Sequence, residues 1–168
     1  MPNVKFINPF IEAATEVLCA EAKVVSTRGN LSLHKSAFTS NQITVLFSLI
    51  GQVQGAVMYG MSTATGLALV SRIMGQKFVE LDNLAQSGLA ELGNVITSRA
   101  IDRLSKAGFE TSISPAALIQ SEGVKISMLD FPRIIVPLNS EIGEITIHLI
   151  LSEDQSGMED QPWVWFND

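Results

Sequence analysis

The chain of 168 residues contains a single cysteine and few charged side chains. One cysteine, Cys19, excludes a disulfide framework and is typical of a protein from a reducing compartment. Only 17% of the residues are charged, and the lysines and arginines form no cluster of the kind that binding to a phosphate backbone requires. We therefore expect no nucleic acid as a partner.

Long apolar runs are absent as well. No uninterrupted apolar segment reaches the ~18 residues that a membrane-spanning helix needs. The N-terminus also lacks the basic region and the apolar stretch of a secretory signal peptide. These absences predict a cytoplasmic protein that contacts no membrane.

Closely spaced metal ligands and the short motifs of several enzyme classes are missing too. His34, His148 and Cys19 lie far apart, whereas zinc sites are recognised by ligands in close pairs. No glycine-rich nucleotide-binding loop and no G-x-S-x-G nucleophile motif occurs. We therefore predict that this chain itself binds no metal and no cofactor.

Apolar residues make up 46% of the chain, enough for one domain of ordinary size with a substantial core. The C-terminal segment differs from the rest, because five acids and no base lie between Ser152 and Asp168. We expect a single domain over residues 1–152, followed by an acidic, aromatic tail over residues 153–168.

Three segments carry the start and stop signals of α-helices. A helix starts well after a side chain that caps its free N–H groups, and it often ends at a glycine. In the first segment Asn8 precedes Pro9, whose fixed φ suits the first helical position. The predicted helices are residues 8–23, residues 63–74 between Ser62 and Gly75, and residues 83–106 before Gly108.

The other apolar runs are rich in β-branched residues and are typical of strands. Short turns with glycine or polar residues separate them in pairs, so they predict two β-hairpins. The first joins residues 43–49 to residues 56–61 through a turn at 51–55, and the second joins residues 132–138 to residues 142–151 through a turn with Asn139 and Ser140.

The chain therefore repeats one unit, a helix that leads into a strand–turn–strand segment. Corresponding strands begin alike, with GAVMY at 55–59 and GEITI at 143–147. Two such units predict an α/β (α+β) fold, in which two pseudo-symmetric helix-plus-hairpin repeats form one sheet packed with long helices.

A sparse line of polar residues runs along the predicted helix 83–106. At about 100° per residue, Ser87, Glu91, Asn94 and Ser98 share one side of this helix, and its apolar residues lie opposite. We call these four residues the polar stripe. An ordinary solvated face would also be polar, but it would carry alternating charges, and asparagine is a mediocre helix former. The stripe is therefore a candidate working surface.

The same spacing recurs in the first predicted helix. There Glu12, Glu16 and Cys19 align with the first three residues of the polar stripe. The glutamate is kept, whereas Cys19 stands in the place of Asn94.

The segment AQSGLAELGNVITSRA resembles the Ser/Asp-x-x-x-Glu-x-x-Asn pattern of the CheC/CheX/FliY phosphatases of bacterial chemotaxis. INPFIEAATEVL, GQVQGAVMYGMS, ISPAALI and IGEITIHLIL are similar to the CheX branch, so that the resemblance covers residues 5–152. In that branch the resemblance implies one active site, on the second repeat helix. The presence of Cys19 in the first repeat fits this pattern.

The resemblance implies a protein phosphatase that dephosphorylates the phospho-aspartate of a CheY-like response regulator. Asn94 would orient the attacking water, Glu91 would dock the regulator's lysine, and Ser87 and Ser98 would contact the partner. Mg²⁺ would come with the regulator. The resemblance also implies a homodimer joined through sheet edges. The alternative is a non-catalytic signalling module that binds a response regulator or another chemotaxis protein.

Overall fold

The computed structural model describes residues 4–35, 38–126 and 132–154. The predicted tail, residues 153–168, thus lies outside the described residues apart from Glu153 and Asp154. None of the described helices combines the length and the apolar character that crossing a bilayer demands.

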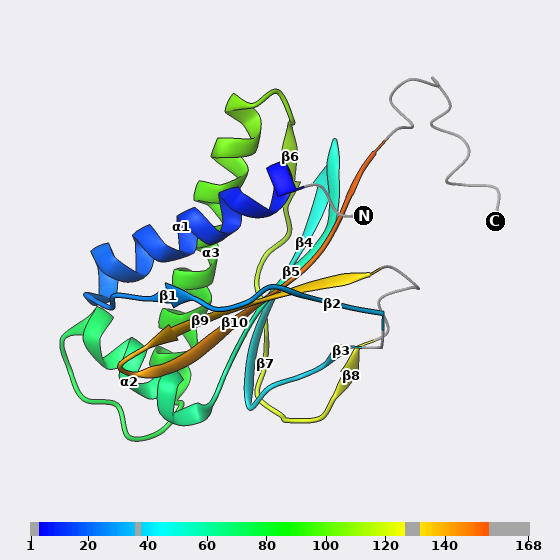
Figure 1. Ribbon diagram of the computed structural model, residues 1–168. Helices are drawn as coiled ribbons and strands as arrows, with labels where there is room; N and C mark the ends of the chain where they lie inside the picture. The colour runs from blue at the N-terminus through cyan, green and yellow to red at the C-terminus, as the bar shows by residue number, and fades with distance from the viewer. Residues whose placement is uncertain (1–3, 36–37, 127–131, 155–168) are drawn as a thin grey trace.

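An eight-stranded antiparallel sheet forms the centre of the fold (Figure 1). The two hairpins predicted from the sequence lie side by side in it, and short strands extend both edges. The hairpin strands are β4 (Ile43–Gly51), β5 (Val53–Met61), β9 (Arg133–Ser140) and β10 (Gly143–Glu153); the edge strands are β1 (Thr27–Arg28), β2 (Ser32–His34), β6 (Thr111–Ile113) and β7 (Ala117–Ile119). The order is β1-β9-β10-β5-β4-β6, with β2 also on β9 and β7 also on β4, while β3 (Phe38–Thr39) and β8 (Lys125–Ile126) pair separately.

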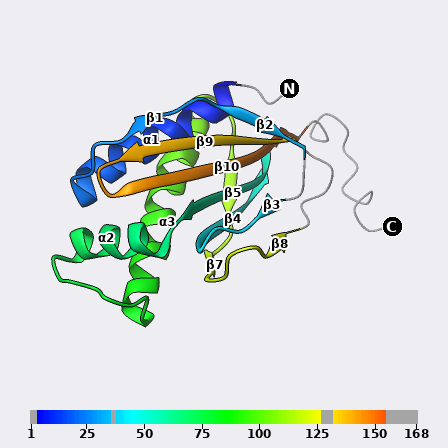
Figure 2. The ribbon, with the colours of Figure 1, turned by 60° about the horizontal axis from the view of Figure 1, so that its bottom comes forward.

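In the described part of the chain, three helices accompany the sheet: α1 (Val4–Ala22), α2 (Thr63–Met74) and α3 (Asn83–Lys106). Figures 1 and 2 show α1 and α3 crossing on the same face of the sheet, with α2 at the end where the β9–β10 hairpin turns. The main core lies between these helices and the strands, and its fully buried members include Phe10, Leu18, Phe47, Leu89 and Ile147.

The bounds of α2 and α3 were predicted correctly, because local capping determines them. The Ser62 hydroxyl accepts a hydrogen bond from the Thr65 N–H, and Gly75 follows the helix in the left-handed region, with φ 66°. Asp82 caps α3 by accepting from the Ala85 N–H at 2.8 Å. Gly108, after the end of α3, has φ 96°.

The predicted start of α1 at Asn8 is wrong. The helix already includes Val4, so that Pro9 lies inside it and not at its first position. A proline there removes one backbone hydrogen bond. The buried side chains of Phe6, Ile7 and Phe10 compensate for that loss, because their packing in the core requires the additional helical turn.

Both predicted turns are displaced from those in the structure. Val53, placed in the first turn, is buried and already part of β5, where it pairs with Glu153 of β10. In the second hairpin β9 continues through Ser140, and the turn is Glu141–Ile142. The Ser140 hydroxyl donates to the Gly143 carbonyl and accepts from the Ile142 N–H, which stabilises the later turn.

The sheet register supports the predicted repeat. Tyr59 and Ile147, which correspond in the alignment of the two repeats, are direct partners across β5 and β10. The two hairpins therefore meet about a local two-fold axis at this pair. Equivalent positions of the outer hairpin strands also face the same core: Ile43, Val45 and Phe47 of β4, and Ile134, Val136 and Leu138 of β9.

Candidate functional site

The inner face of α3 is fixed directly on the strands. Thr97 is fully buried, and its hydroxyl donates to the Gly93 carbonyl at 2.7 Å. Because that hydroxyl has one proton, the buried Tyr59 hydroxyl must donate to Thr97 at 2.7 Å. Burial raises the pKa of Tyr59 well above its usual value, which keeps this donor protonated. A side chain at Gly93 would press against Phe47 and Val45, so the helix lies as close as glycine allows.

This packing turns the polar stripe outward. Ser87, Glu91 and Ser98 are exposed, and Asn94 is partly buried. The structure therefore brings the four predicted site residues together on one open line of α3, as the helical spacing indicated. Their proposed roles remain predictions.

The two central side chains of the stripe are available to a partner. Within residues 4–35, 38–126 and 132–154, no side chain forms a hydrogen bond or an ion pair with the Glu91 carboxylate or the Asn94 carboxamide. The two residues are three positions apart, so that both project from neighbouring turns of the same helix face. A carboxylate and an amide presented in this way can receive a cation and a water molecule at the same time.

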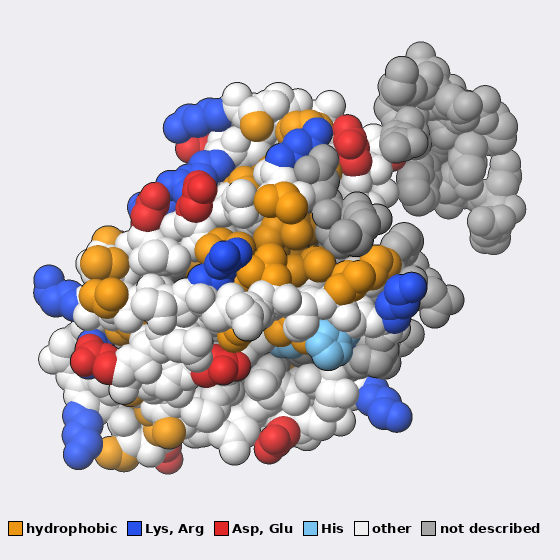
Figure 3. All heavy atoms as spheres, in the orientation of Figure 1, with side chains coloured by type: hydrophobic (Ala, Val, Ile, Leu, Met, Phe, Trp, Pro, Cys, Tyr) orange, Lys and Arg blue, Asp and Glu red, His pale blue; other side chains and the backbone are white. Residues whose placement is uncertain are grey.

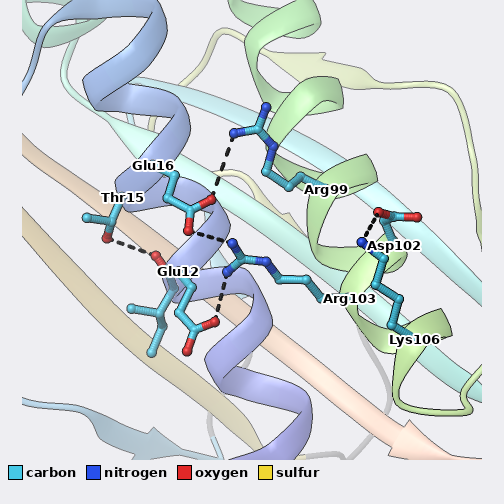
Figure 4. Close-up of polar contacts among 8 residues, drawn as sticks. Glu12, Thr15, Glu16, Arg99, Asp102, Arg103 and Lys106 are labelled. Atoms are coloured by element: carbon cyan, nitrogen blue, oxygen red, sulfur yellow. Dashed lines mark hydrogen bonds and ion pairs between the residues drawn. The ribbon is translucent and has the colours of Figure 1, made fainter.

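The corresponding residues of the first repeat have a different environment (Figure 4). Arg103 of α3 donates to Glu12 at 2.8 Å and also binds Glu16, the counterpart of Glu91. Arg99 lies 3.9 Å from Glu16, and the hydrogen bond from the Arg103 guanidinium lowers the pKa of Glu16. The first repeat therefore uses its glutamate to hold α1 against α3.

Sequence reasoning missed these ion pairs, although a signal for them exists. Glu12 and Glu16 are four residues apart on α1, and Arg99 and Arg103 are four residues apart on α3. Two acids and two bases at this spacing form complementary faces when two helices pack together.

Sequence reasoning also missed a groove beside the stripe. A hollow of about 530 Å³ opens between the end of α1, the end of α2 and the first half of α3. Ser87 and Glu91 belong to its lining, so the groove continues directly from the candidate site. Its other lining residues are Glu21, Ile73, Met74, Gly88, Leu92 and Val95.

The three residues considered as metal ligands do not come together. Cys19 is exposed on α1, His34 lies in β2, and His148 is buried in β10. In the part of the chain that the structure describes, no group of three His, Cys, Asp or Glu side chains could hold a metal ion. Burial lowers the pKa of His148 from 6.5 to about 4, and the positive charge of Arg133 contributes to this shift.

Comparison with known proteins agrees with this fold. The family model described as chemotaxis phosphatase CheX matches residues 43–139, more than half of the chain. The CheY-P phosphatase CheX of Thermotoga maritima is 24% identical over 125 residues, which cover 74% of this chain and 81% of the relative.

Solved structures are similar as well. A CheC-like superfamily protein from Shewanella sp. PV-4 superposes with a TM-score of 0.82 and 25% identity, over 90% of this chain and 99% of that one. The structure of a CheX–CheY–BeF3–Mg complex from Borrelia burgdorferi gives a TM-score of 0.75 and 26% identity, over 88% and 98%.

The sheet of two helix-plus-hairpin repeats places the chain in the CheC-like class of folds. Within this class, the chain belongs to the CheX family of chemotaxis phosphatases. The resemblance and the fold class predicted from the sequence are therefore confirmed.

His148 should make the stability of the fold depend on pH. Its pKa is about 4 in the folded chain against 6.5 when unperturbed, so the unfolded chain binds the extra proton between these values. Stability is then fully present above pH 6.5 and decreases as the pH falls toward 4, by up to about 3 kcal/mol from this residue. Urea unfolding at several pH values measures the effect.

His148→Gln should remove this part of the pH dependence, whereas His34→Gln, at an exposed position, should leave most of it in place, because the charge of His34 is the smallest cause of the shift. Equal losses of stability on acidification in wild type and His148→Gln would contradict the expectation.

Proposed function

We propose that this protein hydrolyses the phosphoryl group carried on an aspartate of a CheY-like response regulator. Membership of the CheX family and the CheY-P phosphatase activity named for the Thermotoga relative support this function. The structural observation that carries it is the pair of unengaged side chains, Glu91 and Asn94, on the outer face of α3.

Asn94 is the residue that we assign to the attacking water. Its carboxamide offers a donor and an acceptor to one water molecule and does not titrate. The water oxygen forms a new bond to phosphorus, the bond from phosphorus to the aspartyl oxygen breaks, and its electron pair returns to the aspartate carboxylate. The phosphate product and the solvent take up the protons of the water. Such a reaction depends mainly on positioning and charge stabilisation, so one amide can have a large effect.

Glu91 is the residue that we assign to the regulator's active-site lysine. It lies one turn before Asn94 and has no competing partner among the described residues, unlike Glu16 in the first repeat. An ion pair with the lysine would fix the register of the regulator on α3. Mg²⁺ belongs to the regulator in this scheme, in keeping with the CheX–CheY–BeF3–Mg complex from Borrelia.

Ser87 and Ser98 would contact the regulator at the two ends of the stripe, and the protein would act in the cytoplasm. A homodimer would form through the sheet edge of β1 and β2, whose outer sides pair with no other described strand. Figure 3 shows hydrophobic side chains gathered in the middle of the face that carries α1, β1 and β2, mainly between α1 and these two strands. Leu31 and Leu33, 37% and 43% exposed, support this edge as the contact.

Asn94→Ala should abolish most of the hydrolysis and leave docking intact, because it removes only the group that orients water. We expect kcat to fall by about 10²-fold, equivalent to about 2.7 kcal/mol on the barrier. The measurement is the decay of phosphorylated regulator with the wild type and with the variant. Asn139→Ala, at an exposed amide on β9, is the matched control.

The unfolding free energy of Asn94→Ala should stay within about 0.5 kcal/mol of the wild type, since the partly buried carboxamide has no hydrogen-bond partner among the described residues. Full activity of this variant would refute the mechanism. Absence of any acceleration by the wild type, with measurable binding to a regulator, would identify the non-catalytic signalling module instead.

Glu91→Lys should weaken docking, because it places a like charge beside the regulator's lysine. We expect the Kd for the BeF3-loaded regulator to rise at least about tenfold, which is about 1.4 kcal/mol. Titration calorimetry measures this affinity. Glu122→Lys makes the same charge change at an exposed position between β7 and β8 and should bind normally. If both variants bind like the wild type, Glu91 has no docking role.

A further inference from the structure

The groove beside the polar stripe is built by the close approach of α2 to α3. A Cβ added at Gly88 would lie 2.7 Å from a Val70 methyl and 2.9 Å from the Met74 methyl. Glycine at this position therefore lets the end of α2 lie against α3. The space of about 530 Å³ that remains between the three helix segments has the size of a binding site.

The lining of the groove combines an apolar floor with charges of one sign. Ile73 and Met74 come from α2, and Leu92 and Val95 come from α3. The charged lining residues are Glu21 and Glu91, and no lysine or arginine lines the groove. Such a surface accepts an apolar side chain whose neighbour is a cation.

Glu21 lies outside the machinery already assigned. It is exposed near the end of α1, and within the described part of the chain it forms no ion pair or hydrogen bond. Its carboxylate adds a second acidic group to the groove that Glu91 also lines.

The charges distinguish among possible occupants. A second copy of this chain docked through the same groove would bring Glu21 and Glu91 against their own counterparts, which like charges oppose. The tail over residues 153–168 is also unsuited, since it contains acids and no base. The response regulator fits best, because Ser87 and Glu91 belong both to the groove and to the stripe on which it would dock.

We propose that this groove binds an apolar side chain of the regulator that lies next to a lysine or arginine, and that this contact selects which regulator is dephosphorylated. The inference rests on the proposed function. Glu21 attracts the basic neighbour, while Ile73 and Met74 contact the apolar side chain. These residues determine affinity and specificity, and Asn94 determines the rate of the chemical step.

Two variants test the groove, and each has a matched control. Glu21→Lys reverses an exposed charge, and Met74→Glu puts a charge on the apolar floor. Glu122→Lys and Val79→Glu make the same changes at exposed positions outside the lining, Val79 being 77% exposed. The measurements are KM and kcat with phosphorylated regulator, and the Kd for the BeF3-loaded regulator by calorimetry.

Both groove variants should raise KM and Kd about tenfold, equivalent to about 1.4 kcal/mol, with kcat changed by less than about twofold. The loss in Glu21→Lys should shrink at high salt, because it arises between exposed charges, whereas the loss in Met74→Glu should persist. The control variants should behave like the wild type. Thermal unfolding checks that Met74→Glu is folded, and Glu21→Lys tests the groove without altering its floor.

Unchanged KM and Kd in both groove variants, with an active wild type, would overturn the inference and leave the proposed function intact. A wild type that binds regulators without dephosphorylating them would end the proposed function, while Kd would still test the groove. A change confined to the oligomeric state, seen by sedimentation, would make the groove a subunit contact and would also overturn the inference.

Discussion

The candidate site depends on the close packing of α3 against the central strands of the sheet. Gly93 brings the helix against Phe47, and the buried hydrogen bond between Tyr59 and Thr97 fixes its rotation about its own axis. With one face fixed in this way, the opposite face can only point outward. The line from Ser87 to Ser98 is thus open to a partner because of residues that never touch that partner.

The two repeats share one fold but differ around their corresponding glutamates. In the second repeat, Glu91 has no partner among the described residues. In the first, the counterpart Glu16 is bound by Arg103, which also binds Glu12 and joins α1 to α3 (Figure 4). Exposed ion pairs of this kind contribute little stability one by one. Here they occupy the Glu16 carboxylate, which is therefore not open to a partner as the Glu91 carboxylate is. The two repeats can thus differ in what they bind while they keep the same fold.

Sequence reasoning succeeded where the determinants are local. The caps of α2 and α3 and the helical periodicity of the polar stripe involve residues only a few positions apart, and the chemotaxis phosphatase resemblance is confirmed by the family match. The start of α1 was wrong because the burial of Phe6 and Ile7 overrides the signal from Pro9. The groove could not be predicted, since three helix segments form it and the approach of α2 to α3 depends on close packing at Gly88.

The chemistry assigned to the stripe also limits what the stripe can recognise. In the proposed scheme, the Glu91 carboxylate binds a lysine and the Asn94 amide orients a water. Both groups recognise the phosphorylation site itself, so they contribute to affinity and rate for any such regulator and little to the choice among regulators. Discrimination between partners requires contacts whose strength differs from one regulator to another. The apolar floor of the groove, next to Glu91 but apart from Asn94, is a surface on which such contacts can vary without disturbing the hydrolytic step.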